Sequence, residues 1–111
     1  MIINIQENTG ATLLELREER LDAHNSGDLK NEMLSLFEDG KNQLVIDLKD
    51  VRFIDSSGLG ALVSGYKNAS ARNGNLKLCS LQPQVKSMFE LTRLHRVFEI
   101  YPGADDALAS F

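Results

Sequence analysis

The chain opens with two short segments in which apolar and polar residues alternate, the period that is typical of half-buried β-strands. They span residues 2–6 and 12–16, and the pair Thr9-Gly10 between them has the composition of a turn. Residues 17–25 are rich in charge and carry no apolar period, so we expect a loop there. The pattern therefore predicts a strand, a turn, a second strand and a loop before the first helix.

The next segment changes to the helical period of apolar residues. Its apolar side chains recur at spacings of three and four and form a single stripe, which comprises Leu29, Met33, Leu36 and Phe37. Asn25 or Ser26 can cap the start of this helix, and Asp39-Gly40 is a typical stop. We therefore predict a helix that runs to Glu38.

The middle of the chain repeats the change from strand to helix. Residues 44–48 form a nearly continuous apolar run, which is typical of a strand buried on both faces of a parallel sheet. Residues 51–54 lead from this strand into a second helix, which we expect to end near Asn73-Gly74. The apolar stripe of that helix comprises Leu59, Leu62, Val63 and Tyr66.

Three further elements complete the pattern. Residues 76–81 predict a strand, and Pro83 opens a third helix, since proline suits the first helical turn. Residues 97–100 predict a final strand, and residues 104–111 predict a short closing helix. Strands that alternate with helices imply right-handed crossovers. The fold class that we predict for residues 1–111 is a single α/β domain with a mixed, mostly parallel sheet and about four helices.

Length and composition fit one ordinary globular domain, with 111 residues of which 42% are hydrophobic and 25% charged. The single cysteine, Cys79, cannot form an internal disulfide, and its apolar neighbours predict a buried, inert thiol. No segment approaches the roughly 20 apolar residues of a membrane span. Residues 1–7 lack the basic and apolar regions of a signal peptide. We therefore expect a cytoplasmic protein.

The formal net charge of −4 is concentrated in the first half of the chain. Residues 1–55 carry 12 acidic and 6 basic side chains. Nucleic acid requires a basic protein surface, so we do not expect it as a partner. A basic protein partner and a merely solvated acidic surface are both compatible with this charge.

The segment most informative about function is residues 54–60, Ile-Asp-Ser-Ser-Gly-Leu-Gly, at the junction of a buried strand and a helix. Ligand and partner sites of open α/β sheets collect beyond the carboxyl ends of strands, where this junction belongs. Taken alone, the same residues also make an ordinary helix N-cap, because Asp and Ser oxygens accept hydrogen bonds from free backbone N–H groups.

Residues 54–60 do not match the catalytic and nucleotide-binding motifs that could occur at such a junction. Its serines lack the preceding glycine of a nucleophile elbow, and Ala61 follows Gly60 where a P-loop needs lysine. His24 and His95 have no Cys or His at metal-ligand spacing. We therefore predict that the chain is not an enzyme, holds no metal and needs no cofactor. A small enzyme or nucleotide-binding α/β domain is the alternative from another class.

In this setting the sequence resembles a known family, the bacterial anti-sigma-factor antagonists of the STAS domain type. Residues 45–48 and 51–60, which end in Asp-Ser-Ser-Gly-Leu-Gly, look like the signature of that family. Leu21-Asp22 matches the Leu-Asp that precedes the first helix of the family. The resemblance covers nearly the whole chain, because it extends to residues 76–81, 83–89 and 94–100.

The resemblance implies that Ser56 is phosphorylated by an anti-sigma factor that is also a serine kinase. The unphosphorylated form is then expected to bind that kinase and to free the sigma factor or another target. A serine phosphatase of the PP2C type is expected to reverse the modification. The partner-binding residues that the resemblance implies, besides Ser56, are Asp22, Asp55, Ser57, Gly58 and Leu59.

The residues before Leu21 depart from the pattern of the family. Members often carry Gly or Gly-Glu directly before the Leu-Asp pair, whereas this chain has Glu18-Glu19-Arg20. We expect the extra charge to affect which partner docks. The alternative within the same fold is a STAS accessory subunit of a transport or stress-sensing complex, in which Ser56 is not switched.

Overall fold

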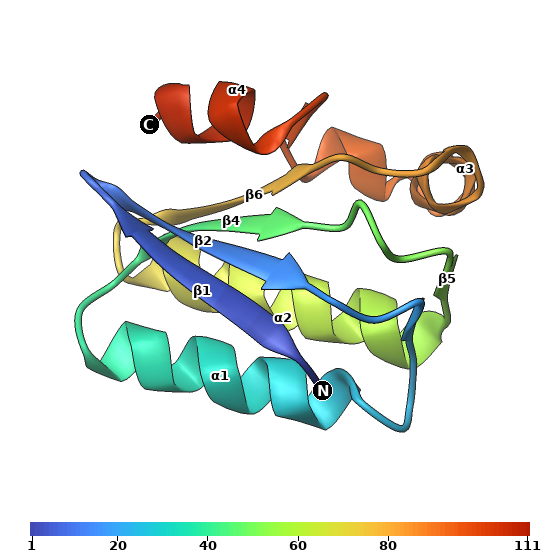
Figure 1. Cartoon of the computed structure of the whole chain (residues 1–111), viewed down its shortest axis with the longest axis horizontal. Coiled ribbons are helices and arrows are strands. Elements are labelled where there is room, and N and C mark those ends of the chain that lie inside the picture. Colours follow the sequence, from blue (N-terminus) through green and yellow to red (C-terminus); the bar gives the residue numbers. More distant parts are fainter.

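A five-stranded mixed sheet lies at the centre of the computed structural model, which describes residues 1–111 (Figure 1). β1 runs antiparallel to β2, and the other neighbouring pairs are parallel. The predicted mixed, mostly parallel sheet is thus confirmed. In spatial order the strands are β1 (Ile3–Asn8), β2 (Ala11–Leu16), β4 (Gln43–Asp47), β6 (Asn75–Cys79) and β7 (Ile100–Tyr101).

Helices cover the two faces of this sheet unequally. α1 (Ser26–Glu38) and α2 (Ser56–Ala71) pack side by side against one face, whereas the short α4 (Ala104–Ala109) lies on the other (Figure 1). α3 (Pro83–Leu91) lies past the carboxyl end of β6 and begins with the proline that predicted its start. The predicted set of four helices is confirmed. A bilayer-spanning helix, which needs greater length and a more apolar sequence, is not among them.

The central strand β4 carries three consecutive apolar residues between Gln43 and Asp47, and both of its faces are covered. Leu44 and Ile46 belong to the main apolar cluster between the sheet and the α1–α2 layer, and Val45 belongs to a smaller cluster beneath α4. All three side chains are fully buried. Each such side chain contributes about 1.5–3 kcal/mol through removal from water, so the two-sided burial of β4 anchors the sheet.

Cys79, at the end of β6, is buried as predicted. It belongs to the small cluster beneath α4, and the chain has no second cysteine with which it could pair. Burial raises the pKa of its thiol to about 11. The reactive thiolate is therefore scarce at neutral pH.

The charged segment before α1 contains a strand that the sequence pattern did not reveal. β3 (Arg20–Leu21) pairs in parallel with β5 (Phe53–Ile54), and the two form a separate two-stranded sheet. The prediction of a loop throughout residues 17–25 is therefore wrong at two positions. A strand of two residues is too short to show a period in the sequence.

Asn25 occupies the N-cap position of α1, but its side chain does not cap the helix. The amide of Asn25 instead accepts a hydrogen bond from the Asp22 N–H at 2.9 Å and donates one to the Arg20 carbonyl at 2.7 Å. Asn25, one of the two residues that we expected to cap the helix, thus stabilises the turn before it.

The final strand is shorter and begins later than predicted. A 3-10 turn spans Leu94–Arg96, and β7 begins only at the last residue of the predicted strand, residues 97–100. Phe98 is instead buried in the main core, where it lies edge-on against Tyr66 and Phe89 with ring centroids 5.3 and 5.8 Å apart. The apolar residues that predicted a strand thus belong to an irregular segment that one aromatic side chain anchors.

Candidate functional site

Ser56 is the exposed first residue of α2, directly after β5 and the N-cap residue Asp55. One carboxylate oxygen of Asp55 accepts a hydrogen bond from the Gly58 N–H at 2.9 Å, and the other accepts one from the Ala23 N–H at 3.2 Å. Asp55 therefore caps α2 and also ties it to a loop 32 residues earlier in the chain. These two bonds fix the backbone that carries Ser56.

Gly58 and Leu59, which follow the serine pair, are both buried. A Cβ atom on Gly58 would collide with the backbone carbonyl oxygen of Leu21, so only glycine permits this close approach of α2 to β3. Leu59 belongs to the main apolar core. In this structure both residues position Ser56 and offer little surface of their own to a partner, while Ser57 is half-buried.

Asp22 lies in the turn between β3 and α1, where the neighbouring Ala23 contacts Asp55, and it is only 8% exposed. Its carboxylate accepts hydrogen bonds from the His24 N–H at 3.0 Å and from Nε–H of Arg20 at 3.2 Å. Burial disfavours the charged carboxylate, but these hydrogen bonds together hold the pKa of Asp22 below its ordinary value. Asp22 and Asp55, the two aspartates expected beside Ser56, thus lie on opposite sides of the contact between the loop before α1 and the start of α2.

Protonation of Asp22 is expected to loosen this turn in acid. A carboxyl whose pKa is lowered by folding contributes stability that is full above its unfolded value, about 3.9, and that is lost as the pH falls through the folded value. We therefore expect Asp22→Asn to lower the urea midpoint of unfolding at neutral pH, and this difference to shrink as the pH falls below about 3.9.

Urea titrations of both proteins across this pH range provide the measurement. Asp50→Asn is the control, because Asp50 only makes a solvent-accessible ion pair with Arg17, 3.8 Å away. A gap between wild type and Asp22→Asn that does not narrow as the pH falls below about 3.9 would contradict the assigned role of the carboxylate.

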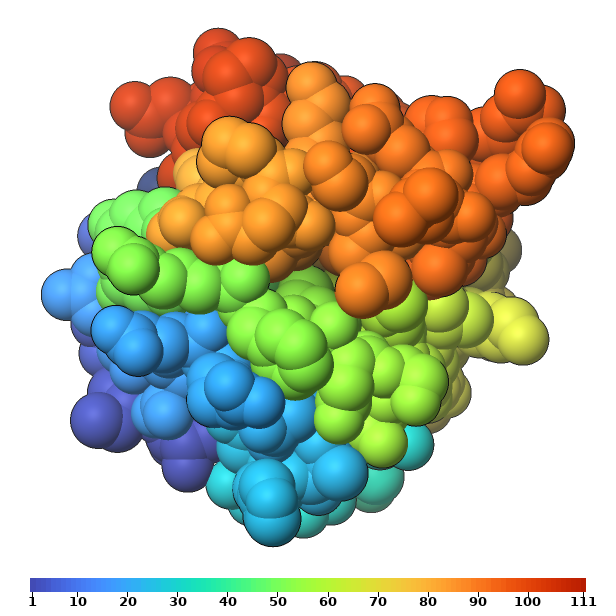
Figure 2. Space-filling model, turned by 90° about the vertical axis from the view of Figure 1, so that its right-hand side faces the viewer, coloured from blue at the N-terminus to red at the C-terminus, as the bar shows by residue number.

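Figure 2 shows the side of the molecule on which β5 and the beginning of α2 lie. Three stretches that are distant in the sequence lie side by side on it: residues 17–25 in blue, residues 50–58 in green and the beginning of α3 in orange. Charges of both signs meet there, in a polar hollow lined by Arg17, Glu18, Glu19, Lys49, Asp50, Arg52 and Gln82. We refer to this face as the Ser56 face.

The sequence analysis did not single out Phe53, and it named Arg20 only as part of the charged segment Glu18-Glu19-Arg20. Phe53 is 41% exposed although it is large and apolar. The guanidinium of Arg20 stacks on it, with Cζ 4.3 Å from the ring centroid. In the sequence, Phe53 and Ile54 are simply two adjacent apolar residues, and only the pairing of β3 with β5 shows which of the two faces outward.

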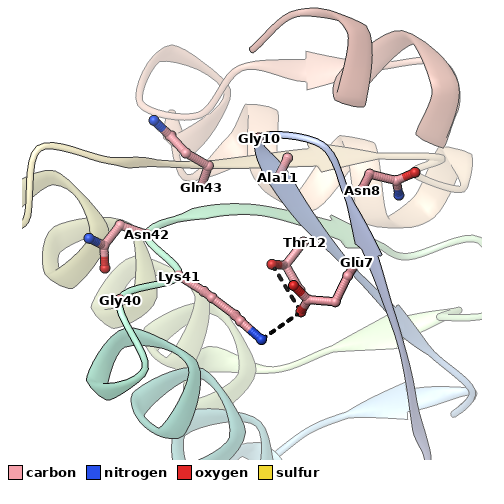
Figure 3. Close-up of a pocket in the computed structure, with 9 residues that line it drawn as sticks. All are labelled: Glu7, Asn8, Gly10, Ala11, Thr12, Gly40, Lys41, Asn42 and Gln43. Carbon is pink, nitrogen blue, oxygen red and sulfur yellow. Dashed lines mark hydrogen bonds and ion pairs between the residues drawn. The ribbon is translucent and has the colours of Figure 1, made fainter.

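The rest of the surface offers weaker candidates for a site. No group of three or more His, Cys, Asp or Glu side chains is placed so that it could hold a metal ion. A second polar hollow, of about 250 Å³, lies at the opposite end of the sheet, by the β1–β2 turn (Figure 3). There the ammonium of Lys41 lies 3.2 Å from the Glu7 carboxylate, to which the Thr12 hydroxyl also donates, at 3.5 Å. These three groups pair with one another, whereas the buried side-chain oxygens of Asn42 and Gln43, which also line the hollow, accept no hydrogen bond.

Comparisons of sequence and of structure with known proteins all point to one family. A family model described as the STAS domain matches residues 3–107. An anti-sigma F factor antagonist of Paenibacillus polymyxa is 28% identical over 107 residues, which cover 96% of this chain and 91% of the relative. An anti-sigma-B factor antagonist of Bacillus subtilis is 30% identical over 98 residues, 88% of each chain. The crystal structure of an anti-sigma factor antagonist from Mycobacterium paratuberculosis superposes with a TM-score of 0.87 at 26% identity, and the match covers 98% of this chain and 92% of that one.

Proposed function

We propose that this chain, which belongs to the STAS domain family, is an anti-sigma-factor antagonist that is controlled by phosphorylation of Ser56. Its unphosphorylated form binds an anti-sigma factor with serine kinase activity and thereby releases the sigma factor or another target. Phosphorylation ends this binding, and a serine phosphatase of the PP2C type restores it. The chain is then a substrate and a binding partner, not a catalyst, and it works in the cytoplasm, where ATP supplies the phosphate.

The observation that carries this proposal is the placement of an exposed serine hydroxyl on a rigid helix start. Ser56 is exposed, whereas Ser57 is half-buried, so a kinase reaches Ser56 more easily. The hydrogen bonds of Asp55 to Gly58 and Ala23 hold the backbone in a fixed position. A pre-positioned acceptor lowers the cost of ordering the substrate in a kinase active site. The names of the relatives support the antagonist role.

The fold is expected to tolerate the phosphate. A phosphoserine adds a charge of about −1.5 to −2 at neutral pH. At the first position of α2, this charge faces the positive end of the helix dipole and free backbone N–H groups, both of which favour an anion. Because Ser56 is exposed, the phosphate also remains hydrated. Modification therefore leaves the sheet and the core unchanged.

The interface, by contrast, is expected to be lost. Asp55 precedes the phosphate directly and Asp22 lies in the adjoining turn, so a dianion is added beside two carboxylates. A partner that closes over this surface has to remove water from the phosphate and bring its own groups against the added charge. Desolvation and like-charge contact of this kind cost several kcal/mol, and about 1.4 kcal/mol corresponds to a tenfold loss of affinity.

Mass spectrometry of the intact protein tests the proposal. The chain is incubated with ATP and each candidate kinase from the same genome, and the modified residue is mapped by fragmentation. We expect one added phosphate on Ser56, its absence from Ser56→Ala, its retention in Ser57→Ala, and its removal by a serine phosphatase. If no candidate kinase adds phosphate to Ser56, the switch is excluded and the constitutive STAS accessory subunit becomes the better description.

A further inference from the structure

The pairing of β3 with β5 decides which side chains of these strands reach solvent. Arg20 lies opposite Phe53, and Leu21 lies opposite Ile54. Successive side chains of a strand point to opposite faces. Leu21 and Ile54 are buried in the core, so Arg20 and Phe53 are both turned outward, onto the Ser56 face.

Arg20 is held in one orientation by two of its neighbours. Its guanidinium lies over the Phe53 ring, with Cζ 4.3 Å from the centroid, and its Nε–H donates to Asp22 at 3.2 Å. The side chain is nevertheless 61% exposed. The terminal nitrogens of Arg20 make no hydrogen bond or ion pair within the chain. An ordered cation thus presents unused donors to solvent beside an exposed aromatic ring.

We propose that Arg20 and Phe53 form the specificity-determining contact of the Ser56 face, and that they bind a partner surface in which a carboxylate lies beside an apolar side chain. The free edge of the guanidinium has two parallel N–H donors, the geometry that matches a carboxylate. The Phe53 ring supplies apolar area that the apolar side chain of the partner covers. This inference rests on the proposed function, because the partner is the anti-sigma factor kinase.

The energetics favour this pair over the other charges of the Ser56 face. Arginine and aromatic residues dominate the binding energy of protein interfaces, whereas exposed ion pairs at the rim contribute little. Stacking on Phe53 and pairing with Asp22 have already restricted the rotamers of Arg20, so less side-chain entropy is lost on binding. Arg17 and Lys49, by comparison, are paired with Asp50 and Glu15.

Binding of the unphosphorylated chain to the kinase that modifies Ser56 tests the inference, with calorimetric titration as the measurement. We expect Arg20→Glu and Phe53→Ala each to weaken binding by about tenfold or more. The double variant is expected to lose less than the product of the two effects, because the side chains act as one unit. Added salt is expected to weaken binding of the wild type more than that of Arg20→Glu.

Arg72→Glu is the matched control. Arg72 also stacks on an aromatic ring, that of Phe37 at 5.2 Å, but it lies at the far end of α2 from Ser56. This variant is expected to bind within about threefold of the wild type. Thermal unfolding of every variant checks whether the fold is retained. If the charge reversal in Arg20→Glu unfolds the chain, Arg20→Gln takes its place.

Two failures are distinguishable. If the wild type binds the kinase and is phosphorylated, but Arg20→Glu and Phe53→Ala bind as the Arg72→Glu control does, the pair is not the specificity contact and the proposed function stands. The same conclusion follows if Arg20→Glu alters only the phosphorylated form, because Arg20 would then serve the phosphate. If no kinase binds or modifies the wild type, both the inference and the proposed function are wrong.

Discussion

Phosphorylated protein is expected to bind the anti-sigma factor kinase at least about a hundredfold more weakly than unphosphorylated protein, and Ser56→Ala is expected to remain bound in the presence of ATP. Ser56→Asp adds a single negative charge at the same helix start, so we expect an intermediate loss of about tenfold. All three forms are expected to unfold at similar temperatures, since the added charge lies at the favourable end of the helix dipole. Titration of the kinase into each form measures the affinity, and thermal denaturation measures the unfolding temperature.

Ser70→Asp is a suitable control for this series. Ser70 is exposed on the same helix but belongs to its last turn, away from the Ser56 face. The same chemical change there is expected to leave affinity for the kinase within about twofold of the wild type and to lower stability slightly through the helix dipole. Equal affinity of Ser56→Ala and the phosphorylated protein would contradict the switch, as would a loss of binding that is explained by unfolding.

Gly58→Ala is expected to destabilise the fold by about 3 kcal/mol, which corresponds to a fall of roughly 10–20 °C in the unfolding temperature. The added methyl group meets the backbone carbonyl of Leu21, which cannot rotate away as a side chain could. Relief of the collision requires α2 to move from β3, and this movement strains the hydrogen bonds that Asp55 accepts from Gly58 and from Ala23, in the loop after β3.

Gly60→Ala provides the comparison within the same helical turn. A Cβ atom at Gly60 meets nothing within 4 Å, so this change only replaces a poor helix former with a good one. We expect it to stabilise the protein by about 0.5–1 kcal/mol. The two alanine variants should therefore move the urea midpoint in opposite directions. Similar shifts of both would show that close contact with β3 is not what requires glycine at position 58.

The main elements of the fold could be predicted from the sequence because their patterns are long. The stripe of α1 and the apolar run of β4 each carry several residues in phase, and the structure places both elements within a residue or two of the expected bounds. β3 and β5 could not be identified as a pair, because each is two residues long and its partner lies beyond α1 in the sequence. The final strand was misplaced because Phe98 packs into the core without a regular strand around it.

The candidate site, too, could be predicted from the sequence only in part. The motif around Ser56 predicted the helix start and the capping role open to Asp55, since both depend on neighbouring residues. The position of Asp22 came from the family resemblance alone. The outward orientation of Phe53 and the steric need for Gly58 could not be predicted, because both depend on Leu21 and Arg20, which approach from another part of the chain. Local patterns predicted a helix start at Ser56, and the family resemblance supplied its proposed role as phosphate acceptor, whereas the surface around it is a tertiary feature.

Assembly of the Ser56 face from β3 and β5 has a consequence for protein quality control. The two strands are separated in the chain by α1 and β4, so the face exists only when the chain has brought residues 20–21 and 53–54 together. A nascent chain, or one damaged in its core, carries the Asp-Ser-Ser-Gly sequence but not the platform around it. Under the proposed mechanism, the kinase then senses correctly folded molecules alone, and misfolded copies neither sequester it nor consume ATP.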